Sequence, residues 1–324
     1  MAKVICLGAA LQDVFLIDHD DFDQLELADG TSLFADLKLG EKVDIDKVVF
    51  ETGGGGTNAA VTLARAGHRT WFIGRIGRDI PGEMIAEKLI DEDINIDHMI
   101  YARKRTGYST ILLAPGGERT IMTYRGASAE YIGLNSKSVK QIKPEWMYVT
   151  TVRGDIELLK DFFGMAAKRD VKIMWNPGNK ELEQRAETLR LLRYVEVLLV
   201  NRGEAEALVG EKLEIEGLAL ELLKKVESVI ITDGRNGAYA ANKKEYFRVG
   251  LYEEVKVKDA TGAGDAFGSG FLAEYARSGD WTQALTYASA NSTGVVQFVG
   301  AKKGIIEKGI KLKKMKIETG GINV

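Results

Sequence analysis

Residues 258–272 have the sequence KDATGAGDAFGSGFL, and this stretch decides the fold. A β-type run ends near Val257, closely spaced small residues follow, and then an apolar helix begins. Gly262 and Gly264 permit a positive φ or a close approach of the backbone to a ligand. The free N–H groups and the dipole at the start of the helix favour an anion. The stretch therefore predicts a strand, an anion-binding turn and a helix.

Asp265 lies inside this turn, although a carboxylate repels a phosphate. Its place makes sense if Asp265 removes a proton from a hydroxyl while the N–H groups stabilise a transferring phosphoryl group. The alternative is a Gly-rich turn in which Asp265 is an ordinary residue of the first helical turn. Taken alone, the turn favours that alternative. Two further stretches of the sequence instead favour Asp265 as a catalytic base.

Three stretches together resemble signatures of the ribokinase-like (PfkB) carbohydrate kinases. The family's D-T-x-G-A-G-D signature is matched at 259–265, except that Ala260 replaces the usual Thr. A Gly-Gly run followed by Asn and an apolar helix appears at 53–60, and an N-x-x-E element appears at 201–204. The stretches occur in the family's order and span nearly the whole chain. The resemblance implies an ATP-dependent kinase that phosphorylates a sugar hydroxyl.

The composition is that of an ordinary globular enzyme. At 324 residues the chain can bury a large core, and its formal charge of −3 gives no electrostatic footprint for nucleic acid. A single cysteine, Cys6, excludes an intrachain disulfide and fits a reducing compartment. The apolar start, 1–10, is too short for a signal peptide, and no window approaches a membrane span. We therefore expect a cytoplasmic protein that binds neither nucleic acid nor membranes.

Strands and helices alternate along most of the chain, which predicts an α/β fold: a doubly wound, mostly parallel sheet covered on both faces. Buried strands are expected at 4–8, 71–74, 146–150, 171–175, 195–200 and 228–232, with an antiparallel pair at 238–241 and 246–249. Helices are expected at 58–66, 81–91, 155–168, 180–192, 266–277 and 281–297. The core domain should comprise 1–13, 52–98 and 126–324.

Two segments, 14–51 and 99–125, interrupt this alternation and predict a small β-sheet lid. The first has short strands expected at 15–18 and 43–50. The second contains a hairpin, in which strands at 106–113 and 119–124 flank a turn at 114–118. The lysine-rich segment 302–316 is interpreted as a solvated end segment.

We expect the residues that carry out phosphoryl transfer in the turn within residues 258–272. The chain lacks the G-x-x-x-x-G-K-S/T loop, so an anion hole has to come from elsewhere. The turn opens with Gly262. By resemblance, the transferred phosphoryl group faces the backbone N–H groups of the next three residues, Ala263, Gly264 and Asp265. Asp265 is then the general base.

Asn201 and Glu204 follow a predicted strand, at the edge of the sheet where ligands bind. By resemblance, the pair organises waters and Mg²⁺ around the phosphates of ATP, and a carboxylate that works through water suits Mg²⁺. The alternative is that Asn201 caps the next helix and Glu204 completes a capping box.

Weaker matches concern the nucleotide side and a monovalent cation. Four residues resemble nucleotide-side positions of the family: Thr232, Gly234, Gly237 and Asn291. Tight turns need glycine in any case. Asp259 and Thr261 would surround a monovalent cation such as K⁺.

The same resemblance places the sugar on Asp13, Gly54 and Asn58. A carboxylate and an amide beside small residues suit a polyol, because a carboxylate accepts two hydroxyl donors. Arg125 lies where the lid hairpin returns to the core and is either a substrate contact or a surface arginine. Ribokinases usually carry Lys where this chain has Gly55, which leaves the identity of the sugar open.

Two alternatives to a sugar kinase stay open. One is a nucleoside (adenosine-type) kinase of the same family, and the other is a non-catalytic ligand-binding protein on this fold. Asp265 argues against a binder, which needs no base. An oxidoreductase is disfavoured, because residues 53–58 lack the G-x-G-x-x-G spacing and its acidic partner. The resemblance also allows a homodimer formed through the lid.

Overall fold

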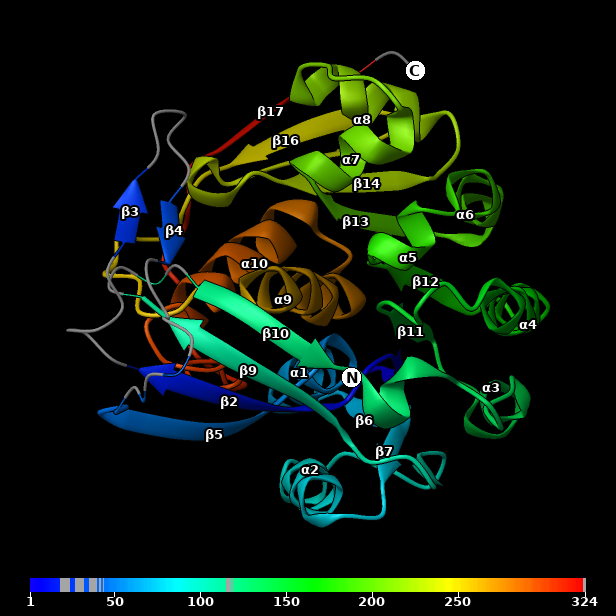
Figure 1. Cartoon of the computed structure of the whole chain (residues 1–324). Coiled ribbons are helices and arrows are strands. Elements are labelled where there is room, and N and C mark those ends of the chain that lie inside the picture. The colour runs from blue at the N-terminus through cyan, green and yellow to red at the C-terminus, as the bar shows by residue number, and fades with distance from the viewer. Residues whose placement is uncertain are drawn as a thin grey trace.

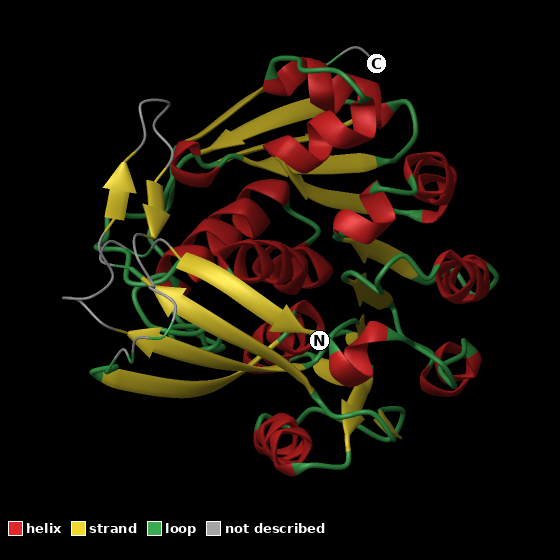
Figure 2. Cartoon of the chain, in the orientation of Figure 1, coloured by secondary structure: helices red, strands yellow, loops and turns green. Residues whose placement is uncertain are grey.

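The computed structural model describes residues 1–17, 24–26, 32–34, 40, 42, 44–114, 117 and 119–322. Its centre is a nine-stranded sheet in the order β17-β16-β15-β14-β13-β12-β11-β1-β6, with helices on both faces (Figures 1 and 2). The predicted doubly wound α/β architecture is confirmed.

Six neighbouring strands of this sheet are parallel: β6 (Arg69–Ile73), β1 (Lys3–Leu7), β11 (Trp146–Val149), β12 (Lys172–Trp175), β13 (Val197–Asn201) and β14 (Ser228–Thr232). Three antiparallel strands continue it: β15 (Ala238–Asn242), β16 (Glu245–Val249) and β17 (Ile317–Gly321). In β1, Val4 and Cys6 face one core layer while Ile5 and Leu7 face the other. This two-sided burial is why the strand is apolar throughout.

Helices of one layer pack against the face that Val4 and Cys6 occupy: α1 (Gly55–Arg65), α2 (Ile80–Asp91), α9 (Ala263–Ser278) and α10 (Trp281–Val295). The other face is covered by α3 (Lys137–Ile142), α4 (Ile156–Ala167), α5 (Asn179–Leu182), α6 (Arg185–Leu191), α7 (Arg202–Val209) and α8 (Ile215–Leu223). Short 3₁₀ turns are η1 (Gly126–Ala129), η2 (Leu192–Tyr194) and η3 (Gly234–Asn236). Among the described residues, no helix is long and apolar enough to cross a membrane.

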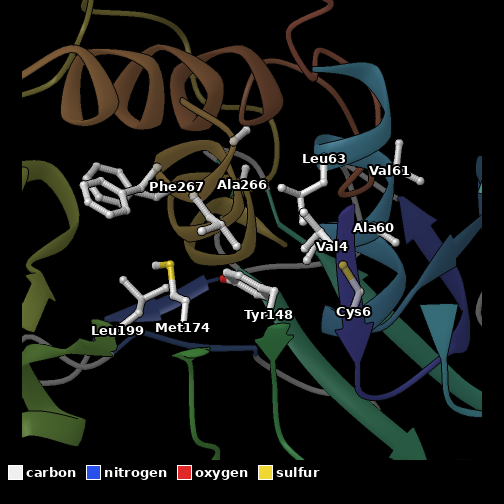
Figure 3. Close-up of a cluster of buried hydrophobic side chains, with 14 of the residues drawn as sticks. Val4, Cys6, Ala60, Val61, Leu63, Tyr148, Met174, Leu199, Ala266 and Phe267 are labelled. Atoms are coloured by element: carbon white, nitrogen blue, oxygen red, sulfur yellow. The ribbon is translucent and has the colours of Figure 1, made fainter. Parts of the chain in front are cut away.

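The core beneath the start of α9 fixes where that helix points. Figure 3 shows Tyr148 of β11, Met174 of β12 and Leu199 of β13 below Ala266 and Phe267 of α9. All five side chains are buried. The packing holds the first turn of α9 over the carboxyl ends of the parallel strands.

A second sheet has the order β10-β9-β2-β5 and lies apart from the first (Figure 1). Its strands are β2 (Leu11–Ile17), β5 (Lys47–Gly53), β9 (Gly107–Leu113) and β10 (Arg119–Tyr124). The expected boundary after Asp13 is wrong by three residues, because β2 begins at Leu11 and Asp13 already pairs with Glu51 and Ser109. We propose that this sheet is the lid.

Two further strand pairs accompany the sheets: β7 (Arg75–Gly77) with β8 (Ile100–Ala102), and β3 (Gln24–Glu26) with β4 (Ser32–Phe34). Several residues of the expected lid lie outside the described residues, among them Asp18 and Val43 of its strands and Pro115, Gly116 and Glu118 of its hairpin turn.

The helix expected at 180–192 is two helices, α5 and α6, with a break at Gln184. The amide of Gln184 donates to the carbonyls of Lys180 and Gly154, at 3.3 and 2.8 Å. The first of these bonds satisfies the Lys180 carbonyl, which in a continuous helix would accept from the backbone N–H of Gln184. The break is therefore a side-chain effect that periodicity does not reveal.

Close packing of α1 on β1 gives the first testable prediction. A Cβ at Gly56 would lie 2.9 Å from the Cα and carbonyl carbon of Gly8, so Gly56→Ala should lower the free energy of unfolding by about 1–3 kcal/mol. Gly164→Ala in α4 is the control, since a Cβ there meets nothing within 4 Å and should stabilise by roughly 0.5–1 kcal/mol. Urea unfolding of both variants tests this; equal effects would contradict the packing argument.

Candidate active site

Loops from the carboxyl ends of the parallel strands meet the start of α9 around a cavity of about 230 Å³. The turn at 262–265 lines it together with Arg119, Asn176, Asn201, Glu204 and Thr232. This edge of an open α/β sheet is where ligands bind. Four larger cavities, of about 330, 700, 740 and 810 Å³, contain no residue of the three signature stretches.

The turn that begins α9 has the geometry of an anion hole. Gly262 is the N-terminal capping residue of α9 with φ 77°, a left-handed conformation that glycine adopts without strain. A Cβ at Gly264 would meet nothing within 4 Å, so the backbone there borders open space. The N–H of Ala263 donates to the Ala260 carbonyl at 3.3 Å, whereas those of Gly264 and Asp265 have no backbone acceptor among the described residues and can bind an anion in the cavity.

A chain of hydrogen bonds connects the base candidate to two distant segments. Asn58 in α1 donates from Nδ2 to Asp265 Oδ2 at 2.9 Å. Its Oδ1 accepts from Lys302 Nζ at 2.7 Å, and Lys302 also donates to Thr57 Oγ1 at 3.0 Å and to the Thr52 carbonyl at 2.5 Å. The residue Lys302 is only 4% exposed. The expectation that it belongs to a solvated tail is therefore wrong.

The charges in this cluster depend on one another. Burial raises the pKa of Asp265, while the hydrogen bond from Asn58 and the charge of Lys302 oppose that rise. Burial likewise raises the pKa of Asp13, opposed by its hydrogen bond with Ser109 and by Lys302. Burial lowers the pKa of Lys302 to about 8, against the pull of both carboxylates. At neutral pH, Lys302 therefore carries the positive charge that favours ionised carboxylates beside it.

Of the three sugar-side candidates, Asn58 bonds to Asp265, and the Asp13 carboxylate lies against Gly53, next to Gly54 in the chain. Asp13 is buried in β2, close enough that the charge of Asp265 contributes to raising its pKa. Gly54 is the N-terminal capping residue of α1 at φ 94°, and a Cβ there would lie 2.5 Å from the Ala9 carbonyl oxygen. Gly54 thus acts through its backbone, whereas Asp13 and Asn58 bring polar side chains.

Asn201 and Glu204 form a capping box and also line the cavity. Asn201 Oδ1 accepts from the N–H of Glu204 at 2.9 Å, and Glu204 Oε2 accepts from the N–H of Asn201 at 2.8 Å. Burial chiefly raises the pKa of Glu204, and the charge of Asp265 adds to that rise. The capping bond uses Oε2, so Oε1 is the atom that can turn to a ligand. The two interpretations of this pair are compatible.

The remaining nucleotide-side candidates do not all lie at the cavity. Thr232 lines the cavity, whereas Gly234 and Gly237 form the turn between β14 and β15 and do not line it. Asn291 corrects our expectation: it is fully buried in α10, its Nδ2 donates to the Ala266 carbonyl at 2.8 Å, and its Oδ1 accepts from the Ile306 N–H at 2.9 Å. Its amide joins α10 to α9 and cannot reach a nucleotide.

Asp259 is fully buried and fastens two loops. Its Oδ1 accepts from the Thr261 N–H at 2.8 Å, and its Oδ2 accepts from the Gly300 N–H at 2.9 Å. Thr261 Oγ1 is buried without a hydrogen-bond partner in the described part of the chain. Asp259 therefore positions the anion-hole turn, whatever else it binds.

Sequence reasoning missed Arg119 as well as Lys302. Arg119 extends from β10 of the small sheet and lines the cavity beside the anion-hole turn. Its Nε lies 4.0 Å from Asp259 Oδ1 and has no hydrogen-bond partner among the described residues. No local pattern marks either residue, because each acts on a segment far away in the sequence.

The chain is similar to known proteins in sequence and in fold. Residues 1–308 match the family described as pfkB family carbohydrate kinase. Ribokinase from Haemophilus influenzae is 27% identical over 282 residues, covering 83% of this chain and 88% of that protein. Two solved structures share the fold. Adenosine kinase from Sinorhizobium meliloti has a TM-score of 0.78 at 20% identity, covering 94% of this chain and 97% of that one. Arabidopsis thaliana ribokinase complexed with ribose and ATP has a TM-score of 0.77 at 21% identity, covering 95% and 96%.

The buried lysine gives a prediction about stability and pH. The pKa of Lys302 falls from 10.5 to about 8 in the folded chain, so between these values the unfolded chain binds more protons. The free energy of unfolding should therefore rise with pH in that window. From pH 7.5 to 9.5, the wild type should gain about 1–3 kcal/mol relative to Lys302→Met.

Urea unfolding at the two pH values measures this difference. Lys314→Met, at an exposed position of the same segment, is the control. A difference between wild type and Lys302→Met that stays constant or falls as the pH rises would contradict the assignment.

Proposed function

The chain belongs to the pfkB family of carbohydrate kinases, and on that premise we propose that it transfers the γ-phosphoryl group of ATP to a sugar hydroxyl. The observation that carries this proposal is the 2.9 Å hydrogen bond between Asn58 and Asp265. It joins the sugar signature to a carboxylate set within an anion-binding turn. Phosphoryl transfer to a hydroxyl needs a base and an anion hole at one point.

The sugar would lie between the small sheet and the core. Asp13 can accept two hydroxyl donors, and Asn58, the backbone at Gly54 and the side chain of Arg125 supply further polar contacts. Closure of the small sheet over the sugar would exclude water and limit hydrolysis of ATP. Asp13 belongs to that sheet, so closure and sugar binding are coupled.

In the reaction, Asp265 accepts the proton of the attacking hydroxyl. The hydroxyl oxygen forms a bond to the γ-phosphorus as the bond to the β–γ bridging oxygen breaks, and ADP leaves with that electron pair. The N–H groups of Gly264 and Asp265 stabilise the charge on the transferring group, and the N–H of Ala263 joins them only if it gives up its 3.3 Å bond to the Ala260 carbonyl. Arg119, whose Nε has no hydrogen-bond partner in the described part of the chain, adds a positive charge at the same cavity.

Mg²⁺ fits this site through Glu204 and Asn201. Their oxygens are hard donors, and Glu204 Oε1 can hold a hydrated ion through its waters. When bound, Mg²⁺ neutralises phosphate charge. The described residues contain no cluster of three or more acidic, His or Cys ligands, which suits an ion held mainly by phosphates and water. Thr232 borders the same phosphate region.

A monovalent cation fits less well. Thr261 Oγ1 is an available oxygen, but both oxygens of Asp259 accept backbone N–H groups, and Arg119 already places a positive charge beside them. We propose that Arg119 supplies the charge that a monovalent cation such as K⁺ would bring.

The small sheet also supports a homodimer. Apolar side chains on its edge strands are exposed: Val48 and Phe50 of β5, and Ile121, Met122 and Tyr124 of β10. Pairing of two such sheets would cover these side chains. Sedimentation of the chain at several concentrations tests this.

ADP release with ATP and Mg²⁺, against pentoses, hexoses, sugar acids and nucleosides, tests the proposed activity. The panel separates the sugar kinase from the nucleoside kinase, which shares the same machinery. Failure of every acceptor would contradict both.

Asp265→Asn should lower kcat by at least ~10², because the amide cannot take the hydroxyl proton. The amide oxygen can still accept from Asn58, so the thermal midpoint and ATP affinity should change little. Steady-state ADP release measures kcat, with Asp91→Asn, at an exposed position of α2, as the control. A variant that keeps more than about a third of wild-type kcat would refute the role.

Arg119→Met should lower kcat by about 10²–10³ through loss of charge stabilisation in the transition state. The urea midpoint should change little, since Arg119 Nε makes no hydrogen bond in the described part of the chain and its ion pair with Asp259 is long, at 4.0 Å. Arg103→Met, an exposed arginine before β9, is the matched control. If stability falls while kcat is unchanged, Arg119 is only a structural partner of Asp259.

A further inference from the structure

The loop between β11 and α4 holds an arginine in an unusual backbone conformation. Arg153 has φ 62°, and the next residue, Gly154, has φ 74°. The three other non-glycine residues with positive φ in the described ranges, Asp93, Lys143 and Asp170, follow the carboxyl ends of α2, α3 and α4. Left-handed residues are common there. Arg153 instead follows a strand, at the edge of the sheet that binds ligands, where held strain points to function.

A fully buried carboxylate fixes this loop. Glu181 Oε1 accepts from the N–H groups of Val152 and Gly154, at 2.8 and 2.9 Å. Its Oε2 accepts from Thr151 Oγ1 at 2.8 Å and from one further backbone N–H. Both oxygens thus bond to the loop and its surroundings, and Arg153 keeps its conformation without any ligand.

The loop starts beside the proposed base. A Cβ at Gly55 would lie 3.1 Å from Asp265 Oδ1 and 3.2 Å from Thr150 Cγ2. Asp265 and Thr150 therefore flank the same glycine, and Arg153 is three residues further along the chain. The loop borders the acceptor side of the site.

One nitrogen of the Arg153 guanidinium, Nε, lacks a partner. Its Nε is buried and has no hydrogen bond within the part of the chain that the structure describes. Buried donors in folded proteins are nearly always paired, so an unpaired one calls for an explanation. A ligand that accepts hydrogen bonds would supply the missing partner.

The segment that follows a second guanidinium, that of Arg125, contacts the same loop, because the Tyr131 hydroxyl donates to the Thr151 carbonyl at 3.2 Å. Arg125, half-buried at the end of β10, has a pKa lowered by burial and then by the charge of Arg153, with Asp13 opposing. Two like charges held together destabilise the empty site unless an anion joins them. Planar guanidinium groups match the geometry of carboxylates and phosphates.

We propose that the acceptor carries an anionic group, a carboxylate or a phosphate, besides the hydroxyl that is phosphorylated. Arg125 and Arg153 together bind that group, while Asp13 and Asn58 bind hydroxyls. The proposal rests on the kinase function proposed above and narrows its substrate class to sugar acids or sugar phosphates.

Matched acceptors test it. ADP release should be compared for D-gluconate against D-glucitol, and for D-fructose 1-phosphate and 6-phosphate against D-fructose. At least one anionic acceptor should exceed its neutral partner in kcat/KM by about tenfold or more. A higher value for gluconate identifies the anionic group as a carboxylate, and a higher value for a fructose phosphate identifies it as a phosphate. Equal or higher kcat/KM for the neutral member of every pair would overturn the proposal.

Variants test the residues. Arg153→Gly removes the guanidinium at a position where glycine adopts the observed φ without strain, so the fold should persist. The ratio of kcat/KM for anionic over neutral acceptors should fall about 10- to 100-fold, and Arg125→Met should lower the same ratio. Arg190→Met, an exposed arginine in α6, should leave the ratio unchanged. An unchanged ratio in Arg153→Gly would overturn the proposal.

Calorimetric binding of the same acceptors without nucleotide separates the two proposals. Anion binding that Arg153→Gly abolishes, together with no ADP release from any acceptor, supports the arginine site and refutes the kinase function. Phosphorylation of neutral acceptors, with no tighter binding of any anionic one, supports the kinase and refutes the arginine site.

Discussion

The site depends on one buried positive charge. Lys302 reaches Asn58, and Asn58 reaches Asp265, so three segments from opposite ends of the chain share one set of hydrogen bonds. Lys302 also opposes the burial that raises the pKa of Asp13 and of Asp265. Without that charge, two neighbouring buried carboxylates would favour protonation, and neither could serve as base or as acceptor of hydroxyl protons.

Several polar residues combine a structural bond with a place at the site. Asn201 and Glu204 cap α7 and line the cavity, and Asp259 fastens the anion-hole turn to the loop at Gly300. Glu181 fixes the loop that carries Arg153 by accepting hydrogen bonds from its backbone N–H groups. A side chain or loop held by its own hydrogen bonds does not have to be ordered when a ligand binds, so the site is preorganised.

In the proposed function, the small sheet contributes polar side chains to the site as well as covering it. Asp13 lies in β2, Arg119 begins β10, and Arg125 follows it, so two of the proposed acceptor contacts and a charge beside the anion hole come from this sheet or its end. An enzyme built this way completes its site only when the sheet lies over the core. Binding and exclusion of water then become a single event.

The sequence by itself determined the fold class, the order of the six parallel strands along the chain and the turn that holds Asp265. Periodic burial and the residues of a tight turn are local patterns, readable within a few positions. Only the tertiary structure decided the roles of Lys302, Arg119 and Asn291, and the break at Gln184. Whether a charge is solvated or buried depends on its partners, and Lys302 finds Asn58 at a separation of 244 residues. That proximity is a property of the packed fold, which no local pattern records.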